Sequence, residues 1–357
     1  MKKFVTILAF LLLAVLRQGP VFAQEADGLS SQEQDMDVTE LIMGHIGDAY
    51  EWHLTSWKGS DIAIPLPVIV RSKISGWHCF LSSKLEEGRS YEGFVIAPAG
   101  DKYAGKVVET VDGGFVRPFD ISITKTVLAI MFNAVLLVVI ILLCARWYRR
   151  HDVLKEPPHG VAALMEPVIV MIENDVIKDA VGEDYKRYSP YLLTVFFFIL
   201  INNLMGIIPF FPGGANVTGN IAVTLVLALC TFIVTNLFGN RHYWKDILWP
   251  DVPVFLKAPL PIMQVIEFIG LFTKPFSLMV RLFANILAGH AVILGLVCVI
   301  FVTAKMGPVI CGSMTVVSLI FGIFMDCLEL LVAFIQAYVF TILSSVFIGM
   351  SRQHIKN

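Results

Sequence analysis

The chain has 357 residues, of which 56% are hydrophobic and only 16% are charged, and its formal net charge is −2. Soluble domains carry about a quarter charged residues, so a water-soluble chain of this composition would expose large apolar patches. The composition argues against an ordinary soluble domain and against a nucleic-acid partner, and it indicates that the bilayer is the solvent.

The first 23 residues have the pattern of a secretory signal peptide. Lys2 and Lys3 precede an apolar stretch over residues 4–16 that is too short to span a membrane. Val21 and Ala23 are small residues at positions −3 and −1 of a cleavage site before Gln24. The alternative is a short anchor that is never removed. Both interpretations export the segment that follows.

Residues 24–122 are predicted to form a small exported region that is rich in β-strands. An acidic stretch over residues 24–37 is followed by β-type runs at 63–70, 91–96 and 115–123, with Gly and Pro between them. A metal site at His45, His53 and His78 is the less favoured interpretation of three histidines whose spacing fits no metal motif. The six cysteines are scattered without a CxxC pair, so we expect no disulfide and no metal bound to cysteine.

The remaining residues, 123–357, are predicted to form an all-α membrane domain with five membrane segments. These segments cover residues 126–144, 190–211, 220–238, 259–303 and 308–350. As helices, the last two would each be roughly 65 Å long, about twice the hydrocarbon thickness. We therefore expect a helical hairpin that is strongly tilted or broken, with Pro275 as a possible break.

Basic residues predict the orientation of the domain. They cluster between the first and second segments, between the third and fourth, and after the fifth, whereas the opposite loops contain only Lys305. By the positive-inside rule the exported region lies outside a bacterial inner membrane and the C-terminus lies in the cytoplasm. Between the first two segments, one side of a helix is apolar (Val168, Ile169, Ile172, Val176 and Ala180), which indicates a helix on the cytoplasmic membrane surface or a helix that binds a partner.

Polar side chains lie inside the two long segments, where a charge costs at least about 2.5–3.5 kcal/mol. They are Glu267, Lys274, Arg281, Asn285 and His290 in the fourth segment, and Asp326, Glu329 and Gln336 in the fifth. At 100° per residue, Glu267, Lys274, Ser277, Arg281, Asn285 and Ala288 occupy about a third of the helix circumference. Small residues on that face allow another helix to approach Arg281 closely.

A buried arginine keeps its charge at any physiological pH. A fixed cation about 4 Å from a carboxylate, at an effective dielectric of about 20, is worth about 4 kcal/mol, or roughly three pKa units. That is enough to displace a proton from a carboxylic acid, while His290 and Glu329 have side chains that can hold or pass protons. This pattern predicts an ion-translocating protein.

Simpler interpretations exist for each of these residues. Lys274 and Glu267 would extend to the cytoplasmic surface, and Arg281 would form an internal ion pair with Glu329. His290 would be a satisfied core histidine, Gln336 a hydrogen-bonding residue between helices, and Asn203 and Asn216 would satisfy backbone groups at helix ends.

Three stretches resemble the a subunit of F-type ATP synthases. They are KPFSLMVRLFANILAGH at residues 274–290, NLMG at 203–206 followed by Pro209, and QAYVF at 336–340. The resemblance covers roughly residues 120–350 and does not extend to residues 24–120. His290 and Glu329 stand where many bacterial members have the reverse order, which is similar to the mitochondrial arrangement.

The resemblance implies a proton-conducting stator subunit that works against the c-ring and is held by the peripheral-stalk subunit b. In this scheme Arg281 displaces the proton from each c-subunit carboxylate and blocks a shortcut between two aqueous half-channels. Asn285, Gln336, His290 and Glu329 belong to the proton path, and Glu267, Lys274, Ser277, Asp326 and Asn203 are channel or interface candidates. Na⁺ is the less favoured ion. We expect no cofactor and no catalysis by the chain itself, which has no GxxxxGK[ST] loop for ATP.

Two other functions fit the sequence less well. A stand-alone proton-coupled transporter would be expected to show an internal repeat with matching broken helices, and the second and third segments resemble neither the fourth nor the fifth. A simple membrane anchor for the exported region would not require Arg281, His290 and Glu329 at membrane depth.

Overall fold

The computed structural model describes residues 47–57, 60–98, 101–111, 114–151, 156–208, 211–248, 262–304 and 307–352. The chain forms two compact units. The first contains Met1–Met131, Ile208–Ala215 and Gly289–Leu328, and the second contains Phe132–Ile207, Asn216–Ala288 and Glu329–Asn357. The predicted signal peptide and residues 24–46 lie outside the described residues.

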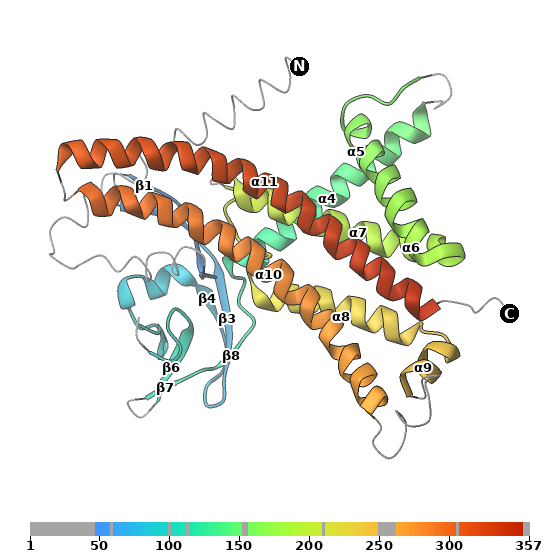
Figure 1. Ribbon diagram of the computed structural model, residues 1–357. Helices are drawn as coiled ribbons and strands as arrows, with labels where there is room; N and C mark the ends of the chain where they lie inside the picture. Colours follow the sequence, from blue (N-terminus) through green and yellow to red (C-terminus); the bar gives the residue numbers. More distant parts are fainter. Residues whose placement is uncertain are drawn as a thin grey trace. The chain divides into compact units, whose positions relative to one another are not determined.

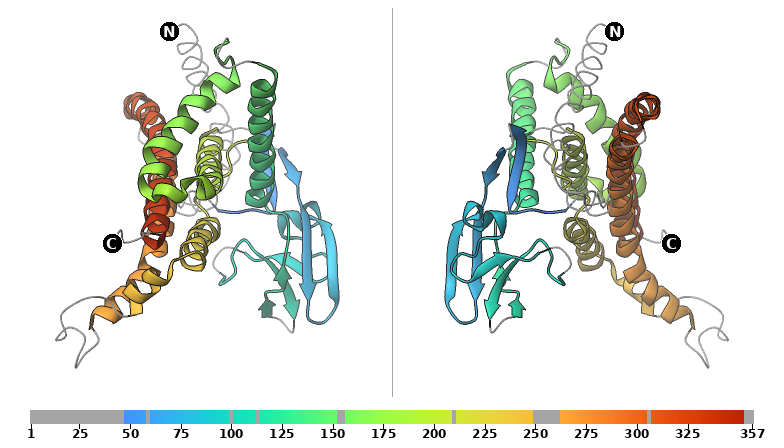
Figure 2. Two further views of the ribbon diagram at one scale, coloured as in Figure 1. Left: turned by 90° about the vertical axis from the view of Figure 1, so that its right-hand side faces the viewer. Right: turned by 90° about the vertical axis from the view of Figure 1, so that its left-hand side faces the viewer.

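Short strands dominate residues 51–120 and confirm that this region is rich in β-structure. The strands are β1 (Glu51–Trp57), β2 (Ser60–Pro65), β3 (Pro67–Ser72), β4 (Gly76–Leu81), β5 (Phe94–Ile96), β6 (Val107–Val111), β7 (Gly114–Val116) and β8 (Phe119–Asp120), with the 3₁₀ helix η1 (Ser82–Gly88) after β4. All pairings are antiparallel, in the orders β1-β2, β4-β3-β8 and β5-β6-β7. Both views of Figure 2 show β3 and β4 side by side as a hairpin.

The core of this β region follows from the two-residue period of its strands. On β3, Val68 and Val70 are fully buried and pack with Phe80 of β4 and Phe94 of β5. Tyr50 is also buried, and its hydroxyl donates a hydrogen bond to the Asp120 carboxylate. Burial, followed by the hydrogen bond to Asp120, raises the pKa of Tyr50 far above its usual value.

The rest of the described chain is helical. The helices are α4 (Lys125–Arg150), α5 (Val161–Met171), the π-helical turn η2 (Ile172–Lys178), α6 (Asp179–Val181), the 3₁₀ turn η3 (Gly182–Asp184), α7 (Tyr185–Ile207), α8 (Ile221–Leu237), α9 (Arg241–Leu248), α10 (Ile262–Ala304) and α11 (Pro308–Arg352). Figure 1 labels the α-helices along the chain.

Four helical stretches are long and apolar enough to cross a membrane: Lys125–Arg150, Val161–Ile207, Met263–Ala304 and Val309–Arg352. The predicted third segment is α8, which has 17 residues and is shorter than these four. At 1.5 Å per residue it measures about 25 Å, less than the roughly 30 Å hydrocarbon thickness. A count of five spans therefore remains a prediction.

The two long segments form single helices of 43 and 45 residues, which Figure 1 shows in orange and red. Pro275 lies inside α10 without interrupting it, so the break that the sequence offered at this position does not occur. Just after the proline, Leu278, Met279 and Leu282 are anchored in the hydrophobic core of the second unit, which holds the helix together there. The tilted hairpin stays an expectation based on helix length.

The predicted surface helix packs instead within the second unit. Ile172, Val176 and Ile177 are buried in the same core as Leu192 of α7. The apolar side that indicated a membrane surface or a partner is thus covered by helices of the chain itself. The sequence pattern identified the apolar side correctly, but it does not distinguish lipid from a neighbouring helix as the covering.

Candidate ion-translocation site

Arg281 lies on the exposed side of α10. The buried side chains Leu278, Leu282 and Ile286 follow one another at four-residue intervals and form an adjacent, buried side of the helix. Around Arg281, the small or polar residues Ser277, Ala284, Asn285 and Ala288 are all exposed. The face predicted by helical spacing is therefore present, and it is slim enough for close contact with another helix.

Within the described part of the chain, Arg281 makes no hydrogen bond and no ion pair. The internal ion pair with Glu329, considered as a simpler interpretation, is not found among the described residues. Glu329 itself is buried, with 5% of its surface exposed. An exposed guanidinium on an apolar helix leaves its positive charge available to a group outside the chain.

A hydrogen bond beside Arg281 joins the two long helices. The Asn285 side-chain amide donates to Gln336 Oε1 at 2.9 Å, and Gln336 is 3% exposed. Its neighbours on α11, Ala333 and Ala337, are fully buried and leave room for the amide. This contact fits the simpler interpretation of Gln336 as a hydrogen-bonding residue, and it also fixes the orientation of Asn285.

A second group of buried polar side chains lies where α7 meets α11 and the loop before α8. Thr218 donates a hydrogen bond to Asn203 Oδ1 at 2.6 Å, and the Asn203 amide donates to the Ala333 carbonyl at 3.3 Å. Nearby in sequence, Asn133 of α4 donates to Asn202 Oδ1 at 2.9 Å. Asn203 thus links tertiary elements, and it does not merely satisfy the end of its own helix.

Asn133, Asn202 and Thr218 were not predicted from the sequence. A signal for Asn133 was present, because a lone amide in the middle of the apolar segment 126–144 is expensive unless it has a partner. That partner, Asn202, is 69 residues away, and periodicity carries no information about such a pairing.

Glu267 and Lys274 are both half-buried near the start of α10. The Lys274 ammonium lies 5.8 Å from the centre of the Phe347 ring, a cation–π contact. Burial, followed by the Glu267 charge, raises the pKa of Tyr243 in α9, whose hydroxyl donates to Asn236. These residues therefore have partners inside the second unit.

His290 and Asp326 are half-buried and belong to the first unit, whereas Glu329 belongs to the second. The proposed coupling of His290 with Glu329 therefore stays a prediction. Of the three histidines considered for a metal site, His45 lies outside the described residues, and nothing is described of the side chain of His53. Both ring nitrogens of His78 contact other groups, Glu92 and Ser75. Among the described residues there is no group of three or more His, Cys, Asp and Glu side chains arranged to hold a metal ion.

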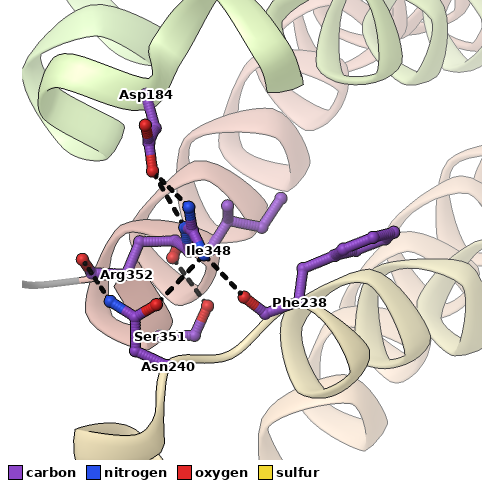
Figure 3. A network of polar contacts seen from close by, with 6 residues as sticks. All are labelled: Asp184, Phe238, Asn240, Ile348, Ser351 and Arg352. Carbon is purple, nitrogen blue, oxygen red and sulfur yellow. Dashed lines mark hydrogen bonds and ion pairs between the residues drawn. The ribbon is translucent and has the colours of Figure 1, made fainter.

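A polar network at the end of α11 was not predicted (Figure 3). The Arg352 guanidinium donates to Asp184 Oδ2 at 2.6 and 2.9 Å, to Asn240 Oδ1 at 3.0 Å and to the Phe238 carbonyl at 3.2 Å. Asn240 in turn donates from its backbone to the Ser351 carbonyl and from its side chain to the Arg352 carbonyl. This network, called here the Arg352 clasp, connects the ends of α11 and α8 with the turn before α7.

These features define a class: a multi-pass membrane protein with long apolar helices, an exposed guanidinium on one of them and buried amides behind it. The model of the ATP synthase A chain family matches residues 128–349. A separate family of unknown function, DUF8433, matches residues 41–121.

Curated relatives agree with the first match. ATP synthase subunit a 2 of Chlorobaculum tepidum is 43% identical over 240 residues, which are 67% of this chain and 66% of the relative. ATP synthase subunit a of Chloroherpeton thalassium is 43% identical over 66% of this chain and 68% of its own length. The corresponding protein of Myxococcus xanthus is 39% identical over 71% of this chain and 80% of its own length. The chain belongs to the ATP synthase subunit a family.

Proposed function

We propose that the chain is the proton-translocating stator subunit of a bacterial F-type ATP synthase, working against a ring of c subunits. The observation that carries the proposal is Arg281, exposed on a slim face of α10 without a hydrogen bond or ion pair among the described residues. A carboxylic acid on a passing helix would meet this permanent cation in a medium of low dielectric. The cation favours the ionised form and so releases the proton.

The same charge also blocks a direct path for protons. A proton between two half-channels would have to pass a fixed positive charge, which the low dielectric makes unfavourable. Ions would then cross only when carried by the moving partner. Asn285 and Gln336, hydrogen-bonded to each other beside Arg281, would hold this part of the path in place.

The buried polar contact between α7 and α11 suggests where one half-channel runs. Asn203, Thr218 and the Ala333 carbonyl form a continuous polar contact within the apolar core, one turn along α11 from Glu329. His290, Glu329 and Asp326 would complete this path as titratable groups. Glu267, Lys274 and Ser277 would belong to the cytoplasmic half-channel or to the interface with the ring.

The remaining parts of the proposal concern location and partners. The chain would lie in the bacterial inner membrane with its β region outside and its C-terminus in the cytoplasm, and it would be held by subunit b of the peripheral stalk. Proton is the expected ion, since the ring sets the choice between H⁺ and Na⁺. The subunit itself would not catalyse a reaction.

Replacing Arg281 tests the proposal. Arg281→Ala should abolish ATP-driven proton pumping by the assembled complex in vesicles, while ATP hydrolysis by the detached head continues. Arg146→Ala, at an exposed cation near the end of α4, is the matched control and should pump normally. Normal coupled pumping by the Arg281 variant would refute the assignment.

The second candidate, a stand-alone proton-coupled transporter, makes a different prediction about partners. The proposed subunit should co-purify with a ring of small hairpin subunits after mild detergent extraction. A chain that purifies alone and still transports protons in vesicles would favour the transporter.

A further inference from the structure

One face of the β4-β3-β8 sheet, called here the outer face, points away from the core of the β region. Strand register and backbone hydrogen bonds place its residues in three rows. The first row is Trp77, Arg71 and Phe119, the second is Cys79, Ile69 and Ile121, and the third is Leu81, Pro67 and Ile123. Figure 1 labels the three strands that carry them.

The outer face is apolar although it is exposed. Phe119 is 63% exposed, Trp77 57% and Ile121 53%, whereas Val68 and Val70 on the opposite face are fully buried. An antiparallel sheet with one face on a core normally presents polar residues on the other. A face of this composition indicates that something other than water covers it.

The charges described on and beside the outer face are positive. The Arg71 guanidinium lies 5.6 Å from the centre of the Trp77 ring, and Lys73 is exposed in the turn that follows β3. Asp120, which alternates to the inner face, accepts the hydrogen bond from Tyr50.

The third row of the outer face is tied to the first membrane helix. Ile123 donates to the Pro67 carbonyl, and α4 begins two residues later at Lys125. The start of α4 is held by hydrogen bonds from the Lys125 amide to the Ala49 carbonyl and from the Thr126 amide to Asp48. Successive rows are about 7 Å apart along the strands. The first row, which is the most distant, therefore lies roughly 20 Å along the chain from the start of α4.

We propose that the outer face is a lipid-binding surface, which rests on the membrane leaflet where α4 begins and binds acidic phospholipids. The order of its residues favours lipid over a protein partner. Aliphatic side chains are nearest to the span, and Trp77, Phe119 and Arg71 follow, with Lys73 beyond them. Indole rings and basic side chains are typical of the headgroup level, where the ring stays partly apolar and the charge meets phosphate. This proposal depends on α4 being a membrane helix and is independent of the proton path.

Cys79 gives a direct test, because it is an exposed thiol in the middle row. The full chain is placed in nanodiscs that contain phosphatidylcholine and phosphatidylglycerol, with its other five cysteines replaced by alanine. A nitroxide label on Cys79 should collide more with oxygen, which concentrates in lipid, than with a water-soluble nickel chelate. The control is a label at Lys102→Cys with Cys79→Ala, in an exposed turn between β5 and β6, which should show the opposite order.

Each remaining outcome would overturn the proposal. A Cys79 label as accessible to nickel as the Lys102 control would place the outer face in water. A label protected from both oxygen and nickel would show that protein covers the face. Since neither measurement involves ATP or proton pumping, failure here is distinguishable from failure of the proposed function.

The charged part of the proposal has its own test. One basic side chain at an anionic surface changes binding about fivefold. In phosphatidylglycerol nanodiscs, Arg71→Gln should therefore lower the equilibrium constant between the lipid-bound and the water-exposed state of the Cys79 label about fivefold. The nickel accessibility of the label reports this constant. In pure phosphatidylcholine the substitution should have little effect, and equal effects in both lipids would contradict binding to acidic headgroups.

Discussion

At the scale of single residues, the cations of the helical part of the chain differ in their partners. Arg352 is fully engaged by Asp184 and by the end of α8, and Lys274 lies against the Phe347 ring. For Arg281 the described residues provide neither a hydrogen bond nor an ion pair. Its lack of a partner among these residues, together with its position inside the long apolar helix α10, makes Arg281 the candidate for acting on a group outside the chain.

Tyr50 gives a prediction for the dependence of stability on pH. Its pKa in the folded chain is raised, so its contribution to stability is fully present below the usual tyrosine value of 10.0 and is lost as pH rises above it. Above about pH 10, the unfolded chain releases a proton that the folded chain keeps. Tyr50→Phe should reduce the loss of unfolding free energy by about 1.4 kcal/mol per pH unit in this range.

The measurement is the thermal midpoint in detergent between about pH 8 and pH 11, for the original full-length chain and for the Tyr50→Phe variant. At the lower pH, the variant should be less stable by about 1–3 kcal/mol because the Asp120 carboxylate loses its donor. Identical pH slopes for the two chains would show that Tyr50 ionises in the folded state.

At the scale of elements, α11 approaches the segment before α7 very closely at Gly349. A Cβ atom at this position would lie 2.0 Å from the Ala180 carbonyl oxygen, a backbone atom that cannot turn aside. Gly349→Ala should therefore separate the two elements and cost about 1–3 kcal/mol or more. A lower thermal midpoint of the purified chain would report this cost.

Gly322→Ala is the matched control for this prediction. Gly322 lies on the same helix, and a Cβ there would meet no atom within 4 Å. Alanine is the better helix former, so this variant should be as stable as the original chain or slightly more stable. Equal effects of the two substitutions would contradict the importance of the close contact.

The sequence was sufficient to predict the long apolar helices, but not all of the short strands and not the partners of these elements. The apolar run at 126–144 predicted α4, which continues to Arg150 because basic residues are favourable in the last turn of a helix. Helical spacing also predicted the exposed face around Arg281. In contrast, β8 pairs with a distant strand, β3. Phe119 lies 48 residues after its partner Arg71, and Asp120 lies 50 residues after its partner Val70. Asp184 and Arg352 are 168 residues apart, and hydrophobic periods contain no information about such distant contacts.

At the scale of the whole molecule, the two long helices each contribute to both compact units. His290 and Asp326 lie in one unit, and Arg281, Asn285, Gln336 and Glu329 lie in the other. The proposed proton path thus depends on helices that continue from one unit to the other.

The coupling of His290 with Glu329 can be tested by exchanging the two residues. If they act as a pair, the exchanged chain (His290→Glu with Glu329→His) should pump more protons than either His290→Ala or Glu329→Ala. ATP-driven acidification of vesicles, normalised to the amount of assembled complex, provides the measurement. An exchange that is no less damaging than the loss of either residue would exclude the pairing.

The Arg352 clasp has a consequence for the order of events during synthesis. Asp184 and Asn240 leave the ribosome more than 100 residues before Arg352. Until the guanidinium arrives, the Asp184 carboxylate and the Phe238 carbonyl just after α8 lack this donor. A chain truncated before residue 352 would lack the Arg352 clasp, so the end of α11 would lose its hydrogen bonds to Asp184 and Asn240.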